Sequence, residues 1–463
     1  MVPAFFRLAR LARRIFRMAR KVEPFIESQD RKLDGYRTKD WREESPENLL
    51  QDLDRLNVIH AASQWSIVAI AMNMAVRSRF LRRMITRRVP GASLGDVIKG
   101  YGRSGGLAPF EALRELGASA RALDPALLER LASDEVAIDV AAGLAASEPG
   151  RRLLGEFDAF MGRYGFLSAN GSDFSEVPWI ENPRAIWRTV ARIALHGDSA
   201  PSPDGAEAHR DEVLGLVRAG LGPVRRRAFD RLHRSTVRYI GWRERVSMLM
   251  TEDSFLMRRC VLALGRMLVE RGVLEQTEGV FFLYADELRE AVTGRTETGA
   301  AAAATVTAEA ASKVTARKAE MAADAGIDPP ETISADGWNA PPRRPPASEP
   351  GLDSLSGIGA SAGVVRGRAR IVRDPAFEGR HLTRRDILVV PFTDIGWTPV
   401  LAEAGGVVAE SGGQLSHSSI IAREFGIPAV VSVRDATSLI REGQSITVDG
   451  TAGRVYLHPE GKP

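Results

Sequence analysis

The stretch Glu410–Val431, ESGGQLSHSSIIAREFGIPAVV, determines how this chain of 463 residues is interpreted. It follows a short apolar run of the buried-strand type and reaches Ser416 and His417 where a helix should begin. That helix should end at Gly426, because glycine readily forms a left-handed cap and the proline two residues later cannot continue the helix. The pattern therefore predicts one imidazole between the end of a strand and the N-terminus of a helix.

A histidine in this position is suited to phosphoryl chemistry. The free N–H groups and the dipole of a helix N-terminus favour a negatively charged ligand. Gly412 and Gly413 would let a bulky anion approach the backbone closely. A neutral imidazole can attack phosphorus, so we predict a transient phosphohistidine on His417. From the spacing alone, a capping or core histidine in a tight turn is an equally open alternative.

The residues around this stretch, 351–463, predict a compact mixed α/β domain. Short apolar or alternating runs indicate strands, with two helices between them. The expected strands are 363–373, 386–391, 406–409, 429–433, 445–449 and 454–457, the last two joined by the turn DGTAG, and the expected helices are 398–404 and 417–425.

From about Ser354 to Leu457 the sequence resembles the swivelling phosphohistidine domain of the phosphoenolpyruvate-utilising enzymes. The matching segments are GIGASAGVVRGRARIV (357–372), DILVVPFTDIGWTPVLAEAGGVVAESGGQLSHSSIIAREFGIPAVV (386–431) and VDGTAGRV (448–455). The resemblance implies that His417 carries the phosphoryl group and that Arg423 helps to hold the phosphate. The phosphate-binding loop would comprise Gly412, Gly413 and Ser416, although Ser416 is as readily explained as a plain N-cap.

Residues 23–295 are expected to form a mostly helical domain. Two stretches, 160–183 (FMGRYGFLSANGSDFSEVPWIENP) and 239–292, resemble the acceptor-binding domain of the rifampicin phosphotransferase branch. The resemblance implies that this domain binds a hydroxyl compound. The candidate acceptor-binding residues are Tyr164, Asp173, Trp179, Glu181, Arg243 and Glu244. Each can also be explained as a structural contact, which a helical bundle needs in any case.

The same region departs from that branch at two places. The branch usually has a basic and an acidic residue where this chain has Phe166-Leu167 and Gly171-Ser172. We therefore expect a rebuilt acceptor pocket, and the antibiotic itself is not the expected acceptor.

Residues 1–22 hold six arginines and one lysine without an acid, a charge of +7. Because the net charge of the whole chain is +4, the remaining residues carry −3. A basic nucleic-acid-binding body is thereby excluded. Residues 4–21 predict an amphipathic helix with Phe5, Leu8 and Leu11 on its apolar face. Three interpretations stay open: a helix packed on the body, peripheral contact with an anionic membrane or an acidic partner, and a targeting peptide.

Residues 296–350 are expected to form an Ala-rich helix followed by a linker with seven prolines.

The single cysteine, Cys260, excludes an intrachain disulfide framework and favours a reducing, cytoplasmic location. No run reaches the roughly 20 apolar residues that span a bilayer, and the apolar run 65–76 is expected to be a buried helix. No metal site is predicted.

The chain shows a phosphoryl carrier and an acceptor domain, but no Gly-rich loop followed by lysine for a nucleotide. The sequence therefore predicts a phosphotransferase component. A separate ATP-grasp subunit, holding ATP and Mg²⁺, would phosphorylate His417, and a small hydroxyl-bearing acceptor would receive the group. The alternatives are an inactive binding or regulatory protein that keeps the fold, and a component recruited to membranes by residues 4–21.

Overall fold

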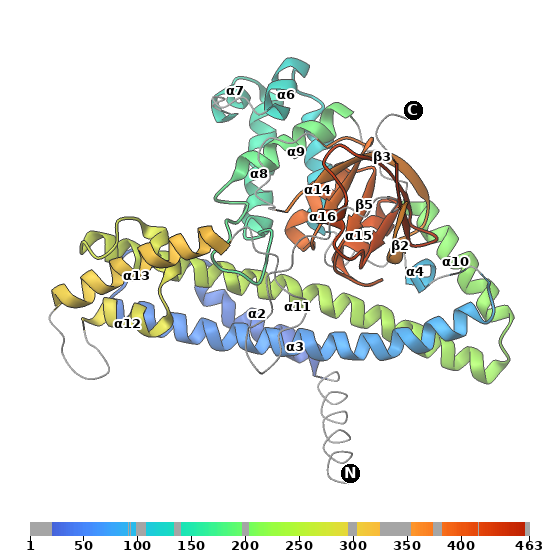
Figure 1. The fold of residues 1–463 in the computed structure, drawn as a ribbon, viewed down its shortest axis with the longest axis horizontal. Helices are drawn as coiled ribbons and strands as arrows, with labels where there is room; N and C mark the ends of the chain where they lie inside the picture. Colours follow the sequence, from blue (N-terminus) through green and yellow to red (C-terminus); the bar gives the residue numbers. More distant parts are fainter. Residues whose placement is uncertain are drawn as a thin grey trace, which may run out of the picture.

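The computed structural model describes residues 21–90, 92, 94–98, 108–133, 140–196, 203–294, 303–324, 353–373, 382–414 and 416–458. The predicted N-terminal amphipathic helix, apart from its last residue, and the Pro-rich linker lie outside these residues. A helical part precedes a mixed α/β part, residues 353–458, which we call the carrier domain (Figure 1). The predicted fold class is confirmed.

Two long antiparallel helices, α3 (Pro46–Thr86) and α11 (Pro223–Glu270), form the base of the molecule (Figure 1). They contain 41 and 48 residues, about 60 and 70 Å at the rise of an α-helix. Each helix has a proline in its first turn, where the missing N–H costs no hydrogen bond. At the start of α3, the Ser45 hydroxyl caps the helix by accepting a hydrogen bond from the backbone N–H of Asn48. Leu56 and Leu81 of α3 and Phe229 of α11 are fully buried in their shared core.

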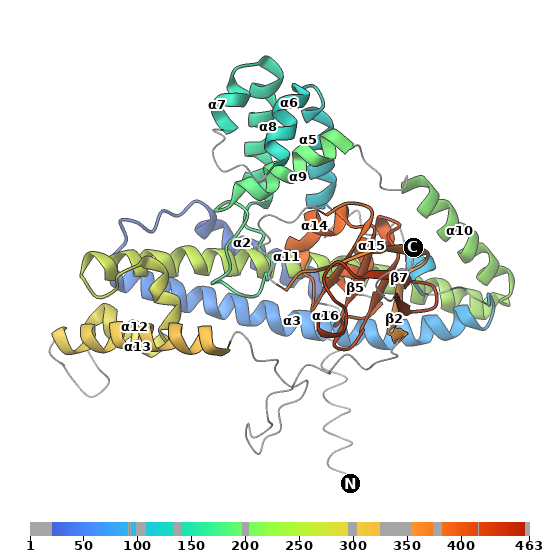
Figure 2. The same cartoon turned by 45° about the horizontal axis from the view of Figure 1, so that its top comes forward.

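The other helices pack around this pair. Short elements lie at its two ends, and α5 to α9 form a second helical unit that rises from it beside the carrier domain (Figure 2). This unit has its own core, in which the rings of Phe157 and Trp187 stack with centroids 3.8 Å apart. The bounds are α2 Val22–Arg37, α4 Leu94–Ile98, α5 Ala108–Ala120, α6 Pro125–Ala132, α7 Val140–Ala145, α8 Glu148–Tyr164, α9 Pro183–His196, α10 Pro203–Ala219, η2 Thr277–Phe282, α12 Ala285–Thr293 and α13 Ala303–Asp324.

The carrier domain is built on an eight-stranded sheet in the order β1-β8-β7-β3-β4-β5-β6-β2. The strands are β1 Ser354–Ser356, β2 Ile358–Ser361, β3 Val364–Ile371, β4 Asp386–Val390, β5 Gly406–Ala409, β6 Ala429–Val431, β7 Ser445–Asp449 and β8 Arg454–Leu457. Only Gly357 separates β1 from β2, although they stand at opposite ends of this order. The sheet must therefore curl until its two edges are neighbours, which leaves little exposed edge.

Alternate residues of the central strands enter two different cores, as the pleat of a strand requires. Ile387 and Val389 of β4 belong to the core on one face of the sheet. Leu388 and Val390 face the other core, which α14 (Thr398–Glu403) and α15 (His417–Glu424) cover. A short helix, α16 (Ala436–Leu439), follows β6.

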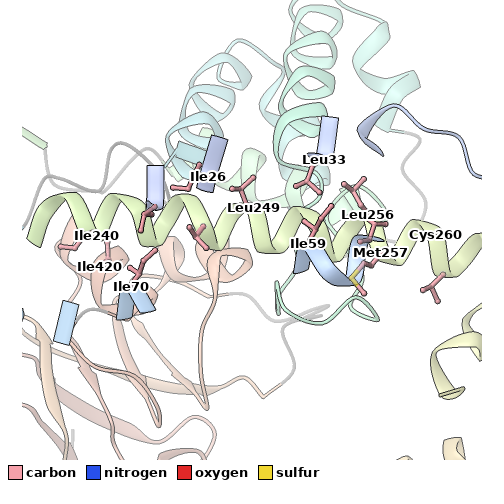
Figure 3. Close-up of a cluster of buried hydrophobic side chains, with 14 of the residues drawn as sticks. Ile26, Leu33, Ile59, Ile70, Ile240, Leu249, Leu256, Met257, Cys260 and Ile420 are labelled. Atoms are coloured by element: carbon pink, nitrogen blue, oxygen red, sulfur yellow. The ribbon is translucent and has the colours of Figure 1, made fainter. Parts of the chain in front are cut away.

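The carrier domain is docked on the helical part. The ring of Phe110 on α5 meets Phe425 at the end of α15 edge-on, with centroids 4.1 Å apart. Ile420 of α15 is buried in the core of the long helices, beside Ile240 and Ile70 (Figure 3). An ion pair of 2.7 Å joins Arg192 of α9 to Glu403 of α14.

Three expectations about local structure were wrong. The apolar run 280–284 allows a short strand from its sequence, but it lies mostly in the 3₁₀ helix η2, and the described helical part offers it no second strand with which to pair. The periodicity predicts helices over 206–233 and 235–272, but the break lies at residues 220–222, before Pro223, and α11 continues through residues 234 and 235. The run 65–76 is helical but not buried throughout, because its buried residues are Ser66, Ala69, Ile70, Asn73 and Met74 while the others face outward or lie at the edge.

One described helix, α3, is long and apolar enough to cross a membrane by length and composition. Of the most apolar 18-residue stretch of α3, 44% is buried inside the protein. The core helices of water-soluble proteins can be equally long and apolar.

We predict that Phe110→Ala weakens the docking of the carrier domain, since removing a buried phenylalanine costs about 3 kcal/mol or more. Amide hydrogen exchange in α15 should become faster than in the wild-type chain. The matched control is Tyr456→Ala, which removes a partly exposed ring from β8 of the same domain. Unchanged exchange in α15 would show that this ring pair does not hold the domain.

A second prediction concerns pH. His233 of α11 is 3% exposed and its Nε2 lies 2.8 Å from the carbonyl oxygen of Val97. Burial lowers the pKa of His233, so the unfolded chain takes up a proton before the folded chain does. Its contribution to stability is present above about pH 6.5 and is lost as the pH falls. In His233→Gln, the free energy of unfolding should fall less between about pH 7.5 and 5.5 than in the wild type. An equal fall, measured by urea denaturation, would contradict this assignment.

Candidate functional site

The loop between β5 and α15 has a conformation that depends on glycine. Gly412 has a φ of +116°, in the region that side chains rarely adopt. A Cβ at this position would also stand 2.9 Å from the Ser416 hydroxyl. At Gly413, by contrast, no heavy atom lies within 4 Å of the place a Cβ would take. The loop is therefore tight at its first glycine and open at its second.

Three serines fix the start of α15. The Ser416 hydroxyl accepts a bond from the backbone N–H of Ser419 at 3.4 Å and lies 2.9 and 3.1 Å from the hydroxyls of Ser419 and Ser418. The Ser419 hydroxyl donates to the carbonyl oxygen of Gly413 at 2.7 Å. Ser416 is thus the N-cap of the helix, and its contact with phosphate stays a prediction.

His417 is the first residue of α15, at the junction of strand end and helix N-terminus that the sequence predicted. The structure describes its backbone, while its ring lies outside what is described. Its place within the first turn puts it beside the free N–H groups and the positive end of the helix dipole. The backbone geometry is therefore compatible with an anion carried on this residue.

Arg423 lies buried at the other end of α15. It is 6% exposed, and its Nη1 donates to the carbonyl oxygen of Ala360 on β2 at 2.8 Å. Its Nη2 has no hydrogen-bond partner among the described residues. Desolvation lowers the pKa of Arg423 to about 10, so the guanidinium remains charged at neutral pH. A buried cation with an unused donor is an unusual feature that calls for a ligand or an ordered water.

Gln414 has the complementary feature. Its Nε2 lies 3.5 Å from the carbonyl oxygen of Gly359, the residue before Ala360 on β2. Its buried Oε1 has no partner within the described part of the chain. Gln414 and Arg423 thus contact neighbouring carbonyls of one strand, and each keeps one polar atom unused. The sequence analysis missed Gln414, because an amide side chain beside two glycines carries no specific signal.

A second candidate site is a cavity of about 780 Å³ in the helical part. It lies between α2, α8, α11 and the loop that follows α8. It is lined by Arg37, Met161, Gly162, Arg163, Phe166, Ile180, Glu181, Glu252, Phe255, Leu256 and Arg259. Its volume falls within the range of pockets that hold small organic molecules.

The cavity wall combines apolar and charged groups. Glu252 is held by Arg37 at 2.7 Å, and Arg259 donates to the backbone carbonyls of Arg37 and Lys39. Burial lowers the pKa of Arg259, whose guanidinium lies over the ring of Phe255. Arg163 is exposed at the cavity wall. Three arginines against two glutamates leave the lining with a small positive excess.

Of the six candidate acceptor residues, only Glu181 lines this cavity. Both of its carboxylate oxygens accept bonds from Arg258, the shortest at 2.8 Å. Tyr164 and Trp179 are buried in the core of the α5–α9 unit, both near Phe160.

The remaining three candidates lie elsewhere. Asp173 accepts hydrogen bonds from the backbone and hydroxyl of Ser175 in an exposed turn. Arg243 and Glu244 pair with each other on α11. Arg243 acts electrostatically on Arg423, so this pair lies near the docked carrier domain. The arginines of the cavity escaped the sequence analysis, since tertiary packing alone brings α2 to α11.

The cavity and the start of α15 lie at different levels of α11. Ile420 contacts the helix at Ile240, whereas Glu252 lies 12 residues further on, a distance of about 18 Å along the axis (Figure 3). Beside Thr251, the residue before Glu252, the loop after α8 contacts the carrier domain: Gly171 N–H donates to Asp394 at 3.0 Å and the Trp397 indole donates to the Ala169 carbonyl at 3.1 Å. Transfer between the two sites would require the domain to move.

Within the described ranges, no three His, Cys, Asp or Glu side chains gather in a way that could hold an ion. Cys260 is buried in α11, and burial raises the pKa of its thiol to about 12, so it is not a reactive thiolate at neutral pH.

Comparison with known proteins shows a similarity for each of the two parts. Residues 382–453 match the mobile domain of PEP-utilising enzymes, and residues 62–244 match the fourth domain of rifampicin phosphotransferase. A rifampicin phosphotransferase of Streptomyces sp is 34% identical over 65% of this chain, and one of Bacillus cereus is 30% identical over 66%. An uncharacterised phosphotransferase of Bacillus subtilis, YvkC, is 29% identical over 68%.

These alignments cover 34%, 35% and 37% of the relatives, so the chain spans about a third of the length of the curated proteins it matches. The likeness therefore concerns two of their domains and not the whole enzymes. Residues 62–244 lie in the helical part and residues 382–453 in the carrier domain. The helical part is thus similar to the fourth domain of rifampicin phosphotransferase, and the carrier domain is similar to the mobile domain of PEP-utilising enzymes.

Proposed function

We propose that the chain is the carrier and acceptor component of a phosphotransferase. The observation that supports this most strongly is the position of His417 at the N-terminus of α15, in a domain that also holds the buried Arg423 with an unused donor. A doubly charged phosphoryl group on the ring would face helix N–H groups rather than carboxylates. The guanidinium of Arg423, in the last turn of the same helix, is the cation proposed to hold that group.

The proposed reaction has two steps. A neutral ring nitrogen of His417 attacks a phosphorus of ATP held by a separate ATP-grasp subunit; a P–N bond forms, a P–O bond breaks, and the nucleotide leaves with the oxygen. A hydroxyl of a small organic acceptor then attacks the phosphorus and loses its proton, the P–N bond breaks, and the imidazole is restored. Mg²⁺ on the donor subunit would neutralise the polyphosphate charge.

We assign the acceptor to the cavity between α8 and α11. Its size, its aromatic and aliphatic lining and its fixed arginines suit a small organic molecule with polar substituents. The carrier domain would leave its docked position on Ile240 to visit the donor and would then return to the level of the cavity. A second candidate function is a protein that binds a small molecule without catalysis, which the cavity alone would also support.

The first test is transfer of label from ATP. The chain is incubated with an ATP-grasp subunit, Mg²⁺ and ATP labelled at the β or γ phosphate. We expect acid-labile, base-stable label on the protein, which disappears in His417→Ala because no other ring can replace the nucleophile. The matched control is His458→Gln, which changes a histidine of the same domain that is bonded to Thr447 and should keep the label. No label on the wild type with a subunit that hydrolyses ATP would favour the binding protein instead.

The second test concerns the cavity and uses two glycines of α8. A Cβ on either Gly155 or Gly162 would meet no heavy atom within 4 Å, but only Gly162 lines the cavity. Gly162→Phe should therefore fill the cavity without disturbing the fold, whereas Gly155→Phe should leave it open. In a thermal-shift screen of small hydroxyl compounds, those that raise the Tm of the wild type should also stabilise Gly155→Phe, and should fail to stabilise Gly162→Phe. Equal stabilisation of both variants would place the binding site elsewhere.

A further inference from the structure

The outward face of α3 is apolar and open to solvent. Between residues 57 and 76 its exposed residues are Asn57, Val58, Ala61, Gln64, Trp65, Val68, Ala71, Met72, Ala75 and Val76, and none of them is charged. Trp65 is 72% exposed and Val58 70%, and Phe80, one turn further on, is 61% exposed. An uncharged face over more than five helical turns is unlike an ordinary solvated surface and points to a partner.

The spacing along this face is that of a helix-pairing surface. Val58, Trp65 and Met72 recur every seven residues, and Ala61, Val68 and Ala75 form a second series three residues later. These are the a and d positions of three successive heptads. The alanines of the second series leave room for the backbone of a partner helix to approach closely. The face is narrow and has the 3.5-residue period of a helix partner.

The size of the face suits an interface between two proteins. The large exposed side chains are Val58, Trp65, Val68, Met72, Val76 and Phe80. At roughly 100 Å² each, they expose about 600 Å² per chain. Two such faces in contact would bury about 1,200 Å², the lower end of the range for stable protein interfaces.

The charges at the two ends of α3 select an orientation. Beyond the apolar face, the C-terminal end exposes Arg79, Arg82, Arg83 and Arg87. The N-terminal end exposes Glu47, Asp54 and Arg55, and Asp54 is paired with Arg289 of α12. Parallel pairing of two copies would place arginines against arginines, whereas antiparallel pairing places the basic end of each helix against an end without an excess of positive charge.

We propose that α3 pairs with α3 of a second copy of this chain, antiparallel across a two-fold axis near Val68. In this register the numbers of facing residues add up to 137, so Trp65 lies opposite Met72. Asp54, which also pairs with Arg289 of α12, lies opposite Arg83 at each end. A two-fold axis suits this face because both halves of the interface then use the same residues. The pairing is independent of the proposed phosphoryl chemistry.

A lipid bilayer suits the same face less well. The opposite side of α3 is fixed against α11 by buried polar contacts, including His60 with Asp253 at 2.5 Å and Arg77 with Ser235 at 3.0 Å. A spanning α3 would have to leave these contacts or carry them into hydrocarbon. The heptad repeat likewise matches a second helix better than a lipid surface.

The first test is the mass of the full chain in solution, measured by sedimentation equilibrium without detergent. We expect twice the chain mass of 50.4 kDa for the wild type and a single chain mass for Val68→Glu, which places two carboxylates at the axis. The matched control is Val224→Glu, which changes an 80% exposed valine at the start of α11 and should remain dimeric. A monomeric wild type, or a dimeric Val68→Glu, would overturn the proposal.

The second test fixes the orientation by cross-linking, with the native Cys260 buried and unreactive. Trp65→Cys and Met72→Cys chains are purified separately, mixed and oxidised. The proposal predicts a covalent dimer of the two different chains and little product from either chain alone. A Trp65→Cys dimer formed by itself would indicate parallel pairing and would overturn the proposal. Two other results would also overturn the proposal. One is cross-linking of the mixed chains only to an added ATP-grasp subunit, and the other is a monomeric chain that floats with anionic vesicles in a manner that depends on Trp65.

Discussion

The antiparallel packing of α3 against α11 is the constraint on which the rest of the structure depends. Leu56, Leu81 and Phe229 are fully buried along this pair, and neither helix could remain in water at such length without its partner. Because both helices are long and straight in the views of Figures 1 and 2, one pair offers several separate surfaces. The cavity opens at one level of α11, the carrier domain docks at another, and the outward face of α3 stays uncovered.

This arrangement separates the two proposed steps in space. The start of α15 rests against the helical part, where Ile420 is buried beside Ile240, and the acceptor cavity lies further along α11. Among the described residues, the contacts that hold the carrier domain include one ring pair, one ion pair, two hydrogen bonds to the loop after α8 and the burial of Ile420 in the core of the long helices. The proposed carrier function requires that these contacts be released and formed again.

The sequence predicted the carrier domain well because its signals are local. Buried apolar runs marked β4, β5 and β6, and the glycines and Pro428 fixed both ends of α15 around the predicted His417. It did not predict β1 and β2, which contain three and four residues and pair with strands nearly 100 and 70 residues away. The cavity could not be predicted either, since Arg37 and Arg259 meet only through the packing of α2 on α11. The exposed face of α3 was misjudged because hydrophobicity alone does not tell which side of a helix is covered.

The central claim is that one ring, that of His417, carries the phosphoryl group. The most direct measurement is tandem mass spectrometry of the chain after incubation with an ATP-grasp subunit and ATP, with digestion and separation kept at alkaline pH to preserve the P–N bond. The account predicts phosphate on His417 and on no other residue. Phosphate on a different side chain, or an unmodified His417 while the subunit consumes ATP, would contradict it.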